Sequence, residues 1–404
     1  MGHSNSIFNQ IQQFLPHTAF QAIISKYNAN HYTKSLTCQN QLMVMMYAQL
    51  TNKDSLRDIE LGLSLKQNQL YHLGINSIAR SSLSRANNNR DHKIFEDLFY
   101  ALLKRTHDIV LGGSSKNRFS FSNPIYAIDA SYIDTCLSLI PWAKYKTAKG
   151  AIKIHPLLNL RSQIPEFMVI SDGKKTDVTA LKENKDSIIS VLRDSSKNSS
   201  GILVFDRGYI DYSLYKELDD NNIIFVTRTH SRISYKVLGQ HKNDDECCIK
   251  DEMIEFGNRD SRKNYPGALR RIEWFDRKNN RTLSFITNDF KFNAKTIADI
   301  YKARWDIEIF FKWIKQNLKI KTFFGTSKNA VMTQIWIAMI SYLLISYIKY
   351  QVKCSRSLLE LTRIIRESIF EKVHLIDIIG FKAMNIKRKI QDIERWQPDL
   401  FGYG

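Results

Sequence analysis

Four side chains with phosphate- or metal-binding chemistry fall on one side of a predicted helix over residues 297–320. They are Tyr301, Arg304, Glu308 and Lys315, and at about 100° per residue they share a narrow stripe beside the apolar face of the helix. A carboxylate at the edge of a core suits a metal ligand. Lys315 lies about 10 Å further along the axis, where it can reach a phosphate. An amphipathic helix with a solvated polar side is the alternative.

Two further acidic residues occupy positions that favour ligand binding. Asp129 lies inside a predicted strand, PIYAIDASYI (124–133), where a buried acid is rare unless something binds it. Asp206 follows an apolar run in GILVFDRG (201–208), and groups at strand ends line the crevice where open α/β sheets bind ligands. The alternatives are a satisfied structural aspartate for Asp129 and a turn cap for Asp206.

The elements that must position these acids follow one another in a definite order. The pattern predicts strands and helices in the series strand 124–133, strand 151–160, strand 166–171, helix 178–193, strand 201–208, helix 212–220 and strand 223–228. This is the order of the ribonuclease-H-like fold, an α/β architecture. Its first and fourth strands are neighbours, so Asp129 and Asp206 can converge, and Glu308 would complete the set.

Three carboxylates at one point repel one another unless cations neutralise them. Oxygen ligands without His or Cys select Mg²⁺ or Mn²⁺ over zinc. Two such ions, about 3.5–4 Å apart, can activate a nucleophile and stabilise the leaving oxygen in an in-line phosphoryl transfer. The sequence therefore predicts that Asp129, Asp206 and Glu308 are catalytic and bind two Mg²⁺ ions, for which Mn²⁺ can substitute.

The spacing Y-x2-R-x3-E-x6-K resembles the YREK signature of bacterial DDE transposases in the insertion-sequence-four family. Asp129 in IDASYID, Asp206 in VFDRGYID and Glu308 in YKARWDIE are similar to the catalytic triad of that family, in the same order. The resemblance implies DNA transposition, in which water and then a 3′-hydroxyl attack phosphodiesters. It also implies that Tyr301, Arg304 and Lys315 contact the DNA around the cleaved phosphate.

Three more residues are suggested by the resemblance. Lys153 and His155, in the second strand, look like family positions near the site, and a strand pair facing solvent and core is the alternative. Related enzymes use a Trp in a β insertion to hold a flipped base. Trp274 is the only Trp in the corresponding region of this chain, and a core or cross-strand aromatic is the alternative.

The composition favours a polyanionic partner. Lys and Arg number 59 against 40 Asp and Glu, which gives a formal net charge of +19. The longest apolar run, at 335–348, falls short of the roughly 20 residues of a membrane span, so we expect a buried core helix and no membrane. Five cysteines without C-x2-C spacing argue against a zinc site or a disulfide framework and favour the cytoplasm.

Shifts in composition divide the chain into three parts. Residues 1–112 are predicted to form a helical N-terminal DNA-binding domain, and the Gly/Ser/Asn-rich stretch at 112–123 marks a linker. Residues 113–330 are assigned to the ribonuclease-H-like catalytic domain, with a β-rich insertion at about 229–290. Residues 331–404 are assigned to a C-terminal helical region.

The last short helix predicted in the N-terminal part, at 78–87, carries Arg80 and Arg85 among Ser and Asn residues. Such side chains can contact phosphates and base edges, as in a helix-turn-helix-like recognition element. A structural helical bundle with a solvated last helix is the alternative.

The leading hypothesis is a Mg²⁺-dependent transposase that cleaves insertion-sequence ends and transfers the strands. Its expected partner is double-stranded DNA, both the element terminal repeats and the target, and the resemblance implies a homodimer across two ends. We expect a bacterial cytoplasmic protein associated with the nucleoid. One alternative is a ribonuclease-H-like nuclease without strand transfer, which the YREK stripe argues against. The other is a non-catalytic, transposase-derived DNA-binding protein, which the acidic triad argues against.

Overall fold

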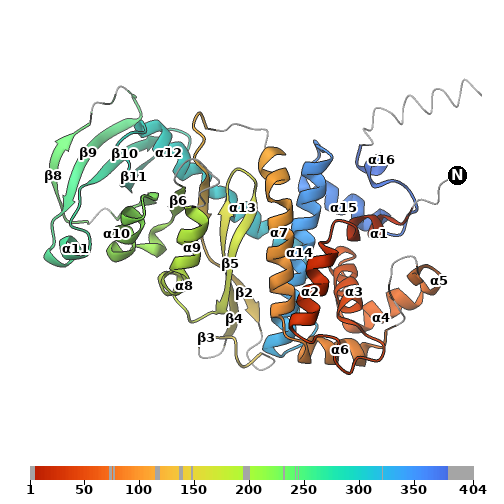
Figure 1. The fold of residues 1–404 in the computed structure, drawn as a ribbon. Helices are drawn as coiled ribbons and strands as arrows, with labels where there is room; N and C mark the ends of the chain where they lie inside the picture. Colours follow the sequence, from red (N-terminus) through yellow and green to blue (C-terminus); the bar gives the residue numbers. More distant parts are fainter. Residues whose placement is uncertain are drawn as a thin grey trace, which may run out of the picture.

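The structure is a computed structural model in which a mixed sheet with its helices lies beside a unit made of helices (Figure 1). It describes residues 5–71, 75, 78–113, 119–135, 140–146, 149–193, 201–230, 233–241, 243, 245–320 and 322–380.

Five strands form the core of the sheet in the order β5-β4-β1-β6-β7. Strand β4 is antiparallel to β1 and β5, whereas β6 is parallel to β1 and β7 is parallel to β6. The five strands are β1 (Ile125–Ile128), β4 (Lys149–Asn159), β5 (Ile164–Asp172), β6 (Ile202–Phe205) and β7 (Ile224–Arg228). This topology confirms the predicted ribonuclease-H-like core.

Strand β6 shows why the apolar run at 202–205 is continuous. Its four residues are buried and point alternately to the two faces of the sheet. Leu203 and Phe205 join a cluster with helices α8 (Asp177–Glu183), α9 (Lys185–Leu192) and α10 (Tyr212–Asp220). Ile202 and Val204 join the main core on the other face.

The β insertion extends the core sheet. Strands β8 (Tyr235–Gln240), β9 (Cys248–Phe256), β10 (Leu269–Asp276) and β11 (Arg281–Thr287) pair antiparallel in sequence, and β11 pairs antiparallel with β7. With β2 (Ser131–Thr135) and β3 (Lys144–Lys146), which pair with β4, the described strands form one eleven-stranded sheet. Helix α11 (Arg259–Asn264) follows β9. Strands thus occupy the segment for which the sequence predicts a β-rich insertion.

Helices from both ends of the chain pack around one central helix, α14 (Lys328–Gln351). The N-terminal helices are α1 (Ile7–Gln12), α2 (His17–Lys26), α3 (Cys38–Leu50), α4 (Leu56–Ser64), α5 (Gln67–Leu70), α6 (Arg80–Asn89) and α7 (Lys93–Gly113). The C-terminal helices are α15 (Leu358–Ser368) and α16 (Leu375–Gly380). The boundaries at 112, 113, 330 and 331 stay predictions, and residues 381–404 lie outside the described part.

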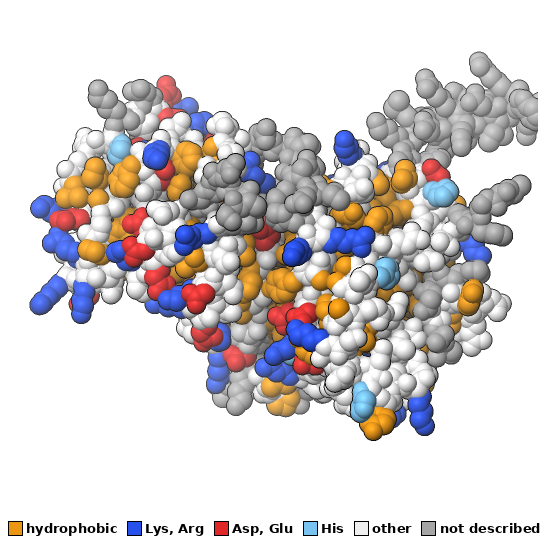
Figure 2. All heavy atoms as spheres, in the orientation of Figure 1, with side chains coloured by type: hydrophobic (Ala, Val, Ile, Leu, Met, Phe, Trp, Pro, Cys, Tyr) orange, Lys and Arg blue, Asp and Glu red, His pale blue; other side chains and the backbone are white. Residues whose placement is uncertain are grey.

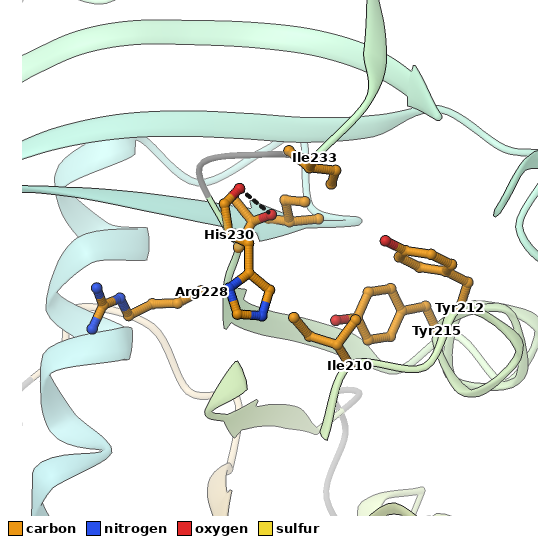
Figure 3. Close-up of a pocket in the computed structure, with 8 residues that line it drawn as sticks. Ile210, Tyr212, Tyr215, Arg228, His230 and Ile233 are labelled. Carbon is orange, nitrogen blue, oxygen red and sulfur yellow. Dashed lines mark hydrogen bonds between the residues drawn. The ribbon is translucent and has the colours of Figure 1, made fainter. Parts of the chain in front are cut away.

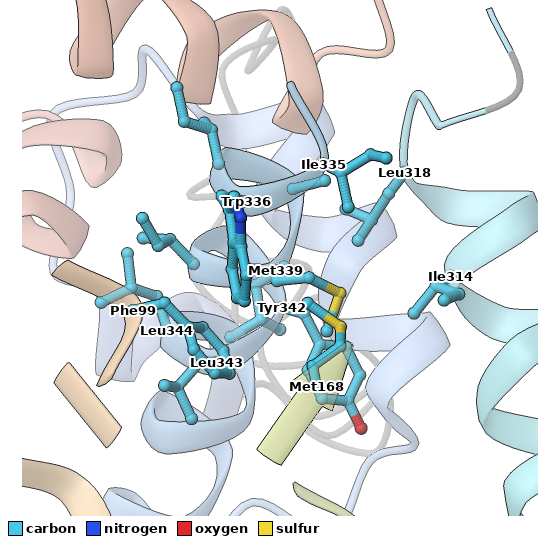
Figure 4. Close-up of a cluster of buried hydrophobic side chains, with 14 of the residues drawn as sticks. Phe99, Met168, Ile314, Leu318, Ile335, Trp336, Met339, Tyr342, Leu343 and Leu344 are labelled. Carbon is cyan, nitrogen blue, oxygen red and sulfur yellow. The ribbon is translucent and has the colours of Figure 1, made fainter. Parts of the chain in front are cut away.

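Helix α14 is apolar on all sides because other elements surround it. Every residue from Ala330 to Ile348 is buried, and Trp336 packs against Phe99 of α7 (Figure 4). By length and composition α14 could cross a membrane, but its apolar window is wholly buried within the protein. This agrees with the predicted core helix.

The helix predicted at 297–320 is two helices, α12 (Ala294–Ala303) and α13 (Trp305–Asn317). At the junction, the N–H of Arg304 donates to the carbonyl of Tyr301 at 3.1 Å, and that of Ile307 donates to the carbonyl of Arg304 at 3.0 Å. These bonds span three residues, and Arg304 has φ −51° and ψ −30°, as in a 3₁₀ turn. The prediction of one uninterrupted helix was therefore wrong, because this tight turn reorients the chain at Arg304.

Candidate active site

The register of two parallel strands brings Asp129 and Asp206 together. Ala127 of β1 lies opposite Val204 of β6, and the same offset carried forward by two residues puts Asp129 opposite Asp206. Neighbouring strands are about 4.8 Å apart. Both acids therefore stand at the same edge, where β1 and β6 end.

The strand predicted at 124–133 is interrupted at this point. Strands β1 and β2 keep one register on β4, which would set Asp129 opposite Pro156 and Ala130 opposite His155. The N–H of Leu160 donates to the carbonyl of Ile125, so these two residues form a hydrogen-bonded pair. Such pairs recur at every second residue of an antiparallel ladder. The same register therefore makes Ala127 with Leu158, and then Asp129 with Pro156, the following hydrogen-bonded pairs. Proline has no N–H to donate. The ladder therefore opens at Asp129, whose carboxylate accepts the Ala130 N–H at 2.7 Å.

Asp206 caps a short 3₁₀ turn, Arg207–Tyr209. Its carboxylate accepts the N–H of Gly208 at 2.7 Å. A Cβ at Gly208 would stand 2.9 Å from Asp206 Oδ1 and 3.7 Å from Asp177 Oδ2, so a larger residue there would displace the Asp206 carboxylate. The turn cap weighed from the sequence is thus present, and it coexists with a carboxylate at the site edge.

Arg304 joins Glu308 to Asp129. Its Nη1 donates to Asp129 Oδ2 at 3.0 Å and its Nη2 to Glu308 Oε1 at 2.7 Å. The guanidinium carbon lies 5.9 Å from the centre of the Tyr301 ring. The Nε of Arg304 is buried and finds no hydrogen-bond partner among the described residues. The turn between α12 and α13 thus aims one cation at two of the three carboxylates.

The pKa of Asp129 is raised to about 6, mainly by burial and also by the nearby carboxylates of Asp206 and Glu308, against the lowering effects of the Ala130 N–H and Arg304. Burial by itself would lower the pKa of Arg304, but Tyr301, Glu308 and Asp129 outweigh it and raise that pKa. Burial likewise raises the pKa of Tyr301, against the charges of Arg304 and Arg228. The site thus holds excess negative charge that favours a cation.

The donor chemistry fits magnesium. Asp129, Asp206 and Glu308 offer oxygen atoms only, and a guanidinium already bridges two of them. As the described side chains stand, no three acidic, His or Cys residues are close enough to share one ion. Arg304 stands between Asp129 and Glu308, so these two would bind an ion only after it moves aside.

Lys153 and His155 lie inside the protein, 3 % and 2 % exposed. Lys153 Nζ is 2.6 Å from Asp177 Oδ1 and 2.9 Å from the carbonyl of Lys175. His155 Nε2 is 3.2 Å from Ser171 Oγ. The charge of Lys153 is thus matched by Asp177, and a DNA contact by either residue stays a prediction.

The remaining predicted DNA contacts are dispersed. Lys315 lies half-buried in the last turn of α13. Trp274 lies half-buried on β10, opposite Leu283 of β11, and packs against the main core. Arg80 and Arg85 are exposed on α6, where the backbone N–H of Arg80 donates to Glu60 at 2.9 Å. The structure does not bring Arg80 and Arg85 to the carboxylates, and all four roles stay predictions.

Arg228 was not predicted. Arg228 is the last residue of β7, at the same edge of the sheet where Asp206 follows β6. Its Nε is buried and has no hydrogen-bond partner among the described residues. It also lines a cavity of about 590 Å³ with Tyr212, Tyr215, His230 and others (Figure 3). In that view its guanidinium extends away from the two tyrosines. An Arg at the end of IIFVTR could have been found by applying the strand-end rule to every strand.

The chain is similar to several known proteins. The family model described as a transposase DDE domain matches residues 120–344, more than half of the chain. A second model, a domain of unknown function, matches residues 3–76. A cryo-EM structure of a piggyBac transposase synaptic complex with hairpin DNA has a TM-score of 0.47 and 11 % identity, covering 99 % of this chain and 87 % of that one.

Three bacterial relatives carry transposase names. A putative transposase of Sinorhizobium fredii is 30 % identical over 239 residues, 58 % of this chain and 64 % of that protein. A probable insertion-sequence transposase of Geobacillus stearothermophilus is 27 % identical over 63 % of this chain and 65 % of that protein. A putative insertion-sequence transposase of Synechocystis is 24 % identical over 79 % of this chain and 88 % of that protein. The matches span just under two thirds of the first two relatives. With residues 120–344 covered by its model, the chain belongs to the transposase DDE domain family.

Proposed function

We propose that this chain is a DNA transposase that cleaves the ends of an insertion sequence and joins them to target DNA. The observation that carries the proposal is the strand register that sets Asp129 opposite Asp206, with Glu308 linked to Asp129 through Arg304. Three carboxylates at one edge of a sheet, in a chain with a net charge of +19, suit chemistry on a phosphodiester.

In this proposal Asp129, Asp206 and Glu308 hold two Mg²⁺ ions, for which Mn²⁺ can substitute. When bound, such ions lower the pKa of an attacking water or 3′-hydroxyl and stabilise the charge on the leaving oxygen. The protein's own part is to fix the three carboxylates at the ends of β1, β6 and the first turn of α13. Arg304 leaves these carboxylates for a DNA phosphate, which its bidentate guanidinium fits.

Four side chains would orient the DNA strand beside the carboxylates. Tyr301, Arg304 and Lys315 follow along α12 and α13, and Arg228 joins them from the end of β7, where its charge acts on Tyr301. Such contacts fix the position of the phosphate without reading sequence. The proposed substrates are the double-stranded terminal repeats and a target duplex, bound by a homodimer in the bacterial cytoplasm at the nucleoid.

The test is to incubate the purified protein with duplexes carrying the ends of its own element, in Mg²⁺ and in EDTA. We expect nicked and joined products in Mg²⁺ alone, and none from Asp129→Ala, Asp206→Ala or Glu308→Ala. Asp299→Ala is the matched control, since Asp299 is an exposed acid of α12 paired with Lys295. Nicks without joined strands would indicate a nuclease, and binding without either product would indicate a non-catalytic DNA-binding protein.

A further inference from the structure

A groove of about 730 Å³ lies in the helical unit, far along the chain from the carboxylates. The loop at 28–36 forms one wall, and helix α6 forms the other. We call the two walls together the loop–α6 face. Figure 2 shows Lys, Arg and His side chains at the lower edge of the helical unit, where α6 lies in Figure 1.

Tyr32 stands out on this face. Its side chain is 91 % exposed, and it is the one exposed large hydrophobic residue among the described lining residues. Its φ of 52° is in the left-handed region, which a bulky residue rarely adopts. The ring of His31 lies 4.0 Å away, centre to centre. An exposed ring on a residue with an unfavourable backbone conformation does not stabilise the core. A contact with a binding partner would account for it.

Arg90 holds this loop in place. Its guanidinium donates to the carbonyls of Ala29, at 2.9 Å, and Leu36, and to Thr33 Oγ1 at 3.2 Å. A fourth bond, of 2.9 Å, goes to Gln41 Oε1 on α3. The loop is therefore anchored at three points to one half-buried guanidinium, which fixes the backbone on either side of Tyr32.

The inner and outer sides of α6 have different tasks. Leu83 and Asn87 are buried, and Asn87 binds Gln41 at 2.7 Å and, through its carbonyl, Asn329 of α14. The outer side exposes Ser81, Arg85 and Asn89, whereas Asn88, also exposed, accepts a hydrogen bond from Ser327 Oγ at 2.7 Å. The helix sequence, RSSLSRANNN, contains no acid. The inner row fixes α6 to the fold, and the outer row is left to face a partner.

The chemistry of the face suits DNA. Arg, Lys, Ser and Asn side chains are the usual phosphate and sugar contacts, and an exposed aromatic ring can pack against a sugar or a base edge. Arg85 and Lys34 line the groove, and among the described lining residues Asp91 is the one acid. A protein-binding patch would need a contiguous apolar area, and Tyr32 alone does not provide one.

We propose that the loop–α6 face binds double-stranded DNA, with Lys34 and Arg85 on phosphates and Tyr32 packed against a base or sugar in the groove of the duplex. The proposal rests on the proposed function and adds a second contact surface to the one beside the carboxylates. It also gives a role to the part of the chain, residues 3–76, whose family model carries none.

The experiment measures binding of a labelled duplex carrying the element end, in EDTA, so that cleavage does not enter. Tyr32→Ala should weaken binding several-fold, because the duplex loses its contact with the ring, and Tyr32→Phe, which keeps the ring, should restore binding. Tyr71→Ala is the matched control, because Tyr71 is 89 % exposed in the same part of the chain but does not line the groove. It should bind as the unmodified protein does.

The double variant Lys34→Ala with Arg85→Ala should lower the slope of log K against log salt by about 1.8, which is 0.9 for each lost phosphate contact. Tyr32→Ala should leave that slope unchanged. Equal binding by the Tyr32 and Tyr71 variants, or an unchanged slope in the double variant, overturns the proposal even if the protein cleaves DNA. Absence of cleavage with these binding differences intact would instead contradict the proposed function alone.

Discussion

The protein has an arginine–carboxylate cluster within the sheet and another between the sheet and α13, and the two differ in how completely their polar atoms are hydrogen-bonded. In the insertion, Arg270 makes two parallel bonds to Asp251, of 2.8 and 2.7 Å, and a third of 2.5 Å to the carbonyl of Phe292. Both side chains are almost fully buried. In the core, Arg304 is divided between Asp129 and Glu308, its Nε lacks a described partner, and Glu308 is 36 % exposed.

The difference separates an ion pair that supports the fold from one that the proposed function uses for chemistry. Removing one partner of the closed Arg270 pair leaves a buried charge without compensation. The Arg304 cluster is open to solvent and has three carboxylates against one cation, so its cation can be exchanged at lower cost. The predictions below test this contrast, beginning with the largest effect.

The largest contrast is in chemistry. Asp129→Ala or Glu308→Ala should lower the rate of strand cleavage by about 10⁴-fold or more, as removal of a catalytic group does, with DNA binding retained. Asp251→Ala should leave the rate per folded molecule unchanged, because Asp251 faces Arg270 and no substrate. Rates are measured on one end duplex and normalised to the folded fraction. Normal cleavage by either site variant would remove that residue from the reaction centre.

Stability should show the opposite order. Arg270→Ala should lower the free energy of unfolding by about 3–5 kcal/mol, because it leaves the buried carboxylate of Asp251 without its ion-pair partner. Arg304→Ala should cost about 1–2 kcal/mol, since Glu308 stays partly hydrated and Asp129 is readily protonated. Urea unfolding of both variants at pH 7 gives the comparison. Similar losses in the two proteins would show that the Arg304 cluster is structural as well.

The carboxylate site shows which features can be predicted from the sequence and which cannot. The apolar runs before Asp206 and around Asp129 are local signals, so strand order and the site edge could be predicted from them. The break beside Asp129 could not, because it depends on which residue of β4 lies opposite, and Pro156 becomes relevant only once the register is known. The turn at Arg304 and the packing of both chain ends on α14 likewise arise from tertiary contacts that periodicity does not contain.

A third group, His155, is buried, and among the described residues Asp177, 4.0 Å away, is the acid that lies against its ring. Burial lowers its pKa to about 4, against the raising effect of Asp177. The imidazole of His155 therefore becomes protonated near pH 6.5 in the unfolded chain but only near pH 4 in the folded protein. The free energy of unfolding consequently falls as the pH drops from about 6.5 to 4.

His155→Gln should remove that share of the pH dependence, which approaches about 1.4 kcal/mol per pH unit. Unfolding free energies of the two proteins, measured between pH 7.5 and 5, should converge as the pH falls. Parallel curves would mean that His155 is protonated in the folded protein too.

The smallest expected effect is at Lys315, two turns beyond Glu308 on α13. Lys315→Ala should weaken end binding several-fold and lower the salt slope by about one unit, without changing the Mg²⁺ and Mn²⁺ response. Glu308→Ala should instead leave end binding and the salt slope unchanged and shift or abolish the Mg²⁺ and Mn²⁺ response. Binding isotherms between 50 and 200 mM salt separate the two, and an unchanged slope would assign Lys315 to the solvated side of the helix.

Pro156 has an evolutionary consequence. A substitution such as Pro156→Ala would supply the N–H that β4 lacks opposite Asp129, and so would let β1 and β2 close into one uninterrupted strand. Selection for a more stable fold alone would favour that change. Selection for a reactive carboxylate would oppose it, because a closed ladder holds the backbone of Asp129 in the flat geometry of a strand. Under the proposed function, position 156 is thus a point where a single substitution trades activity for stability.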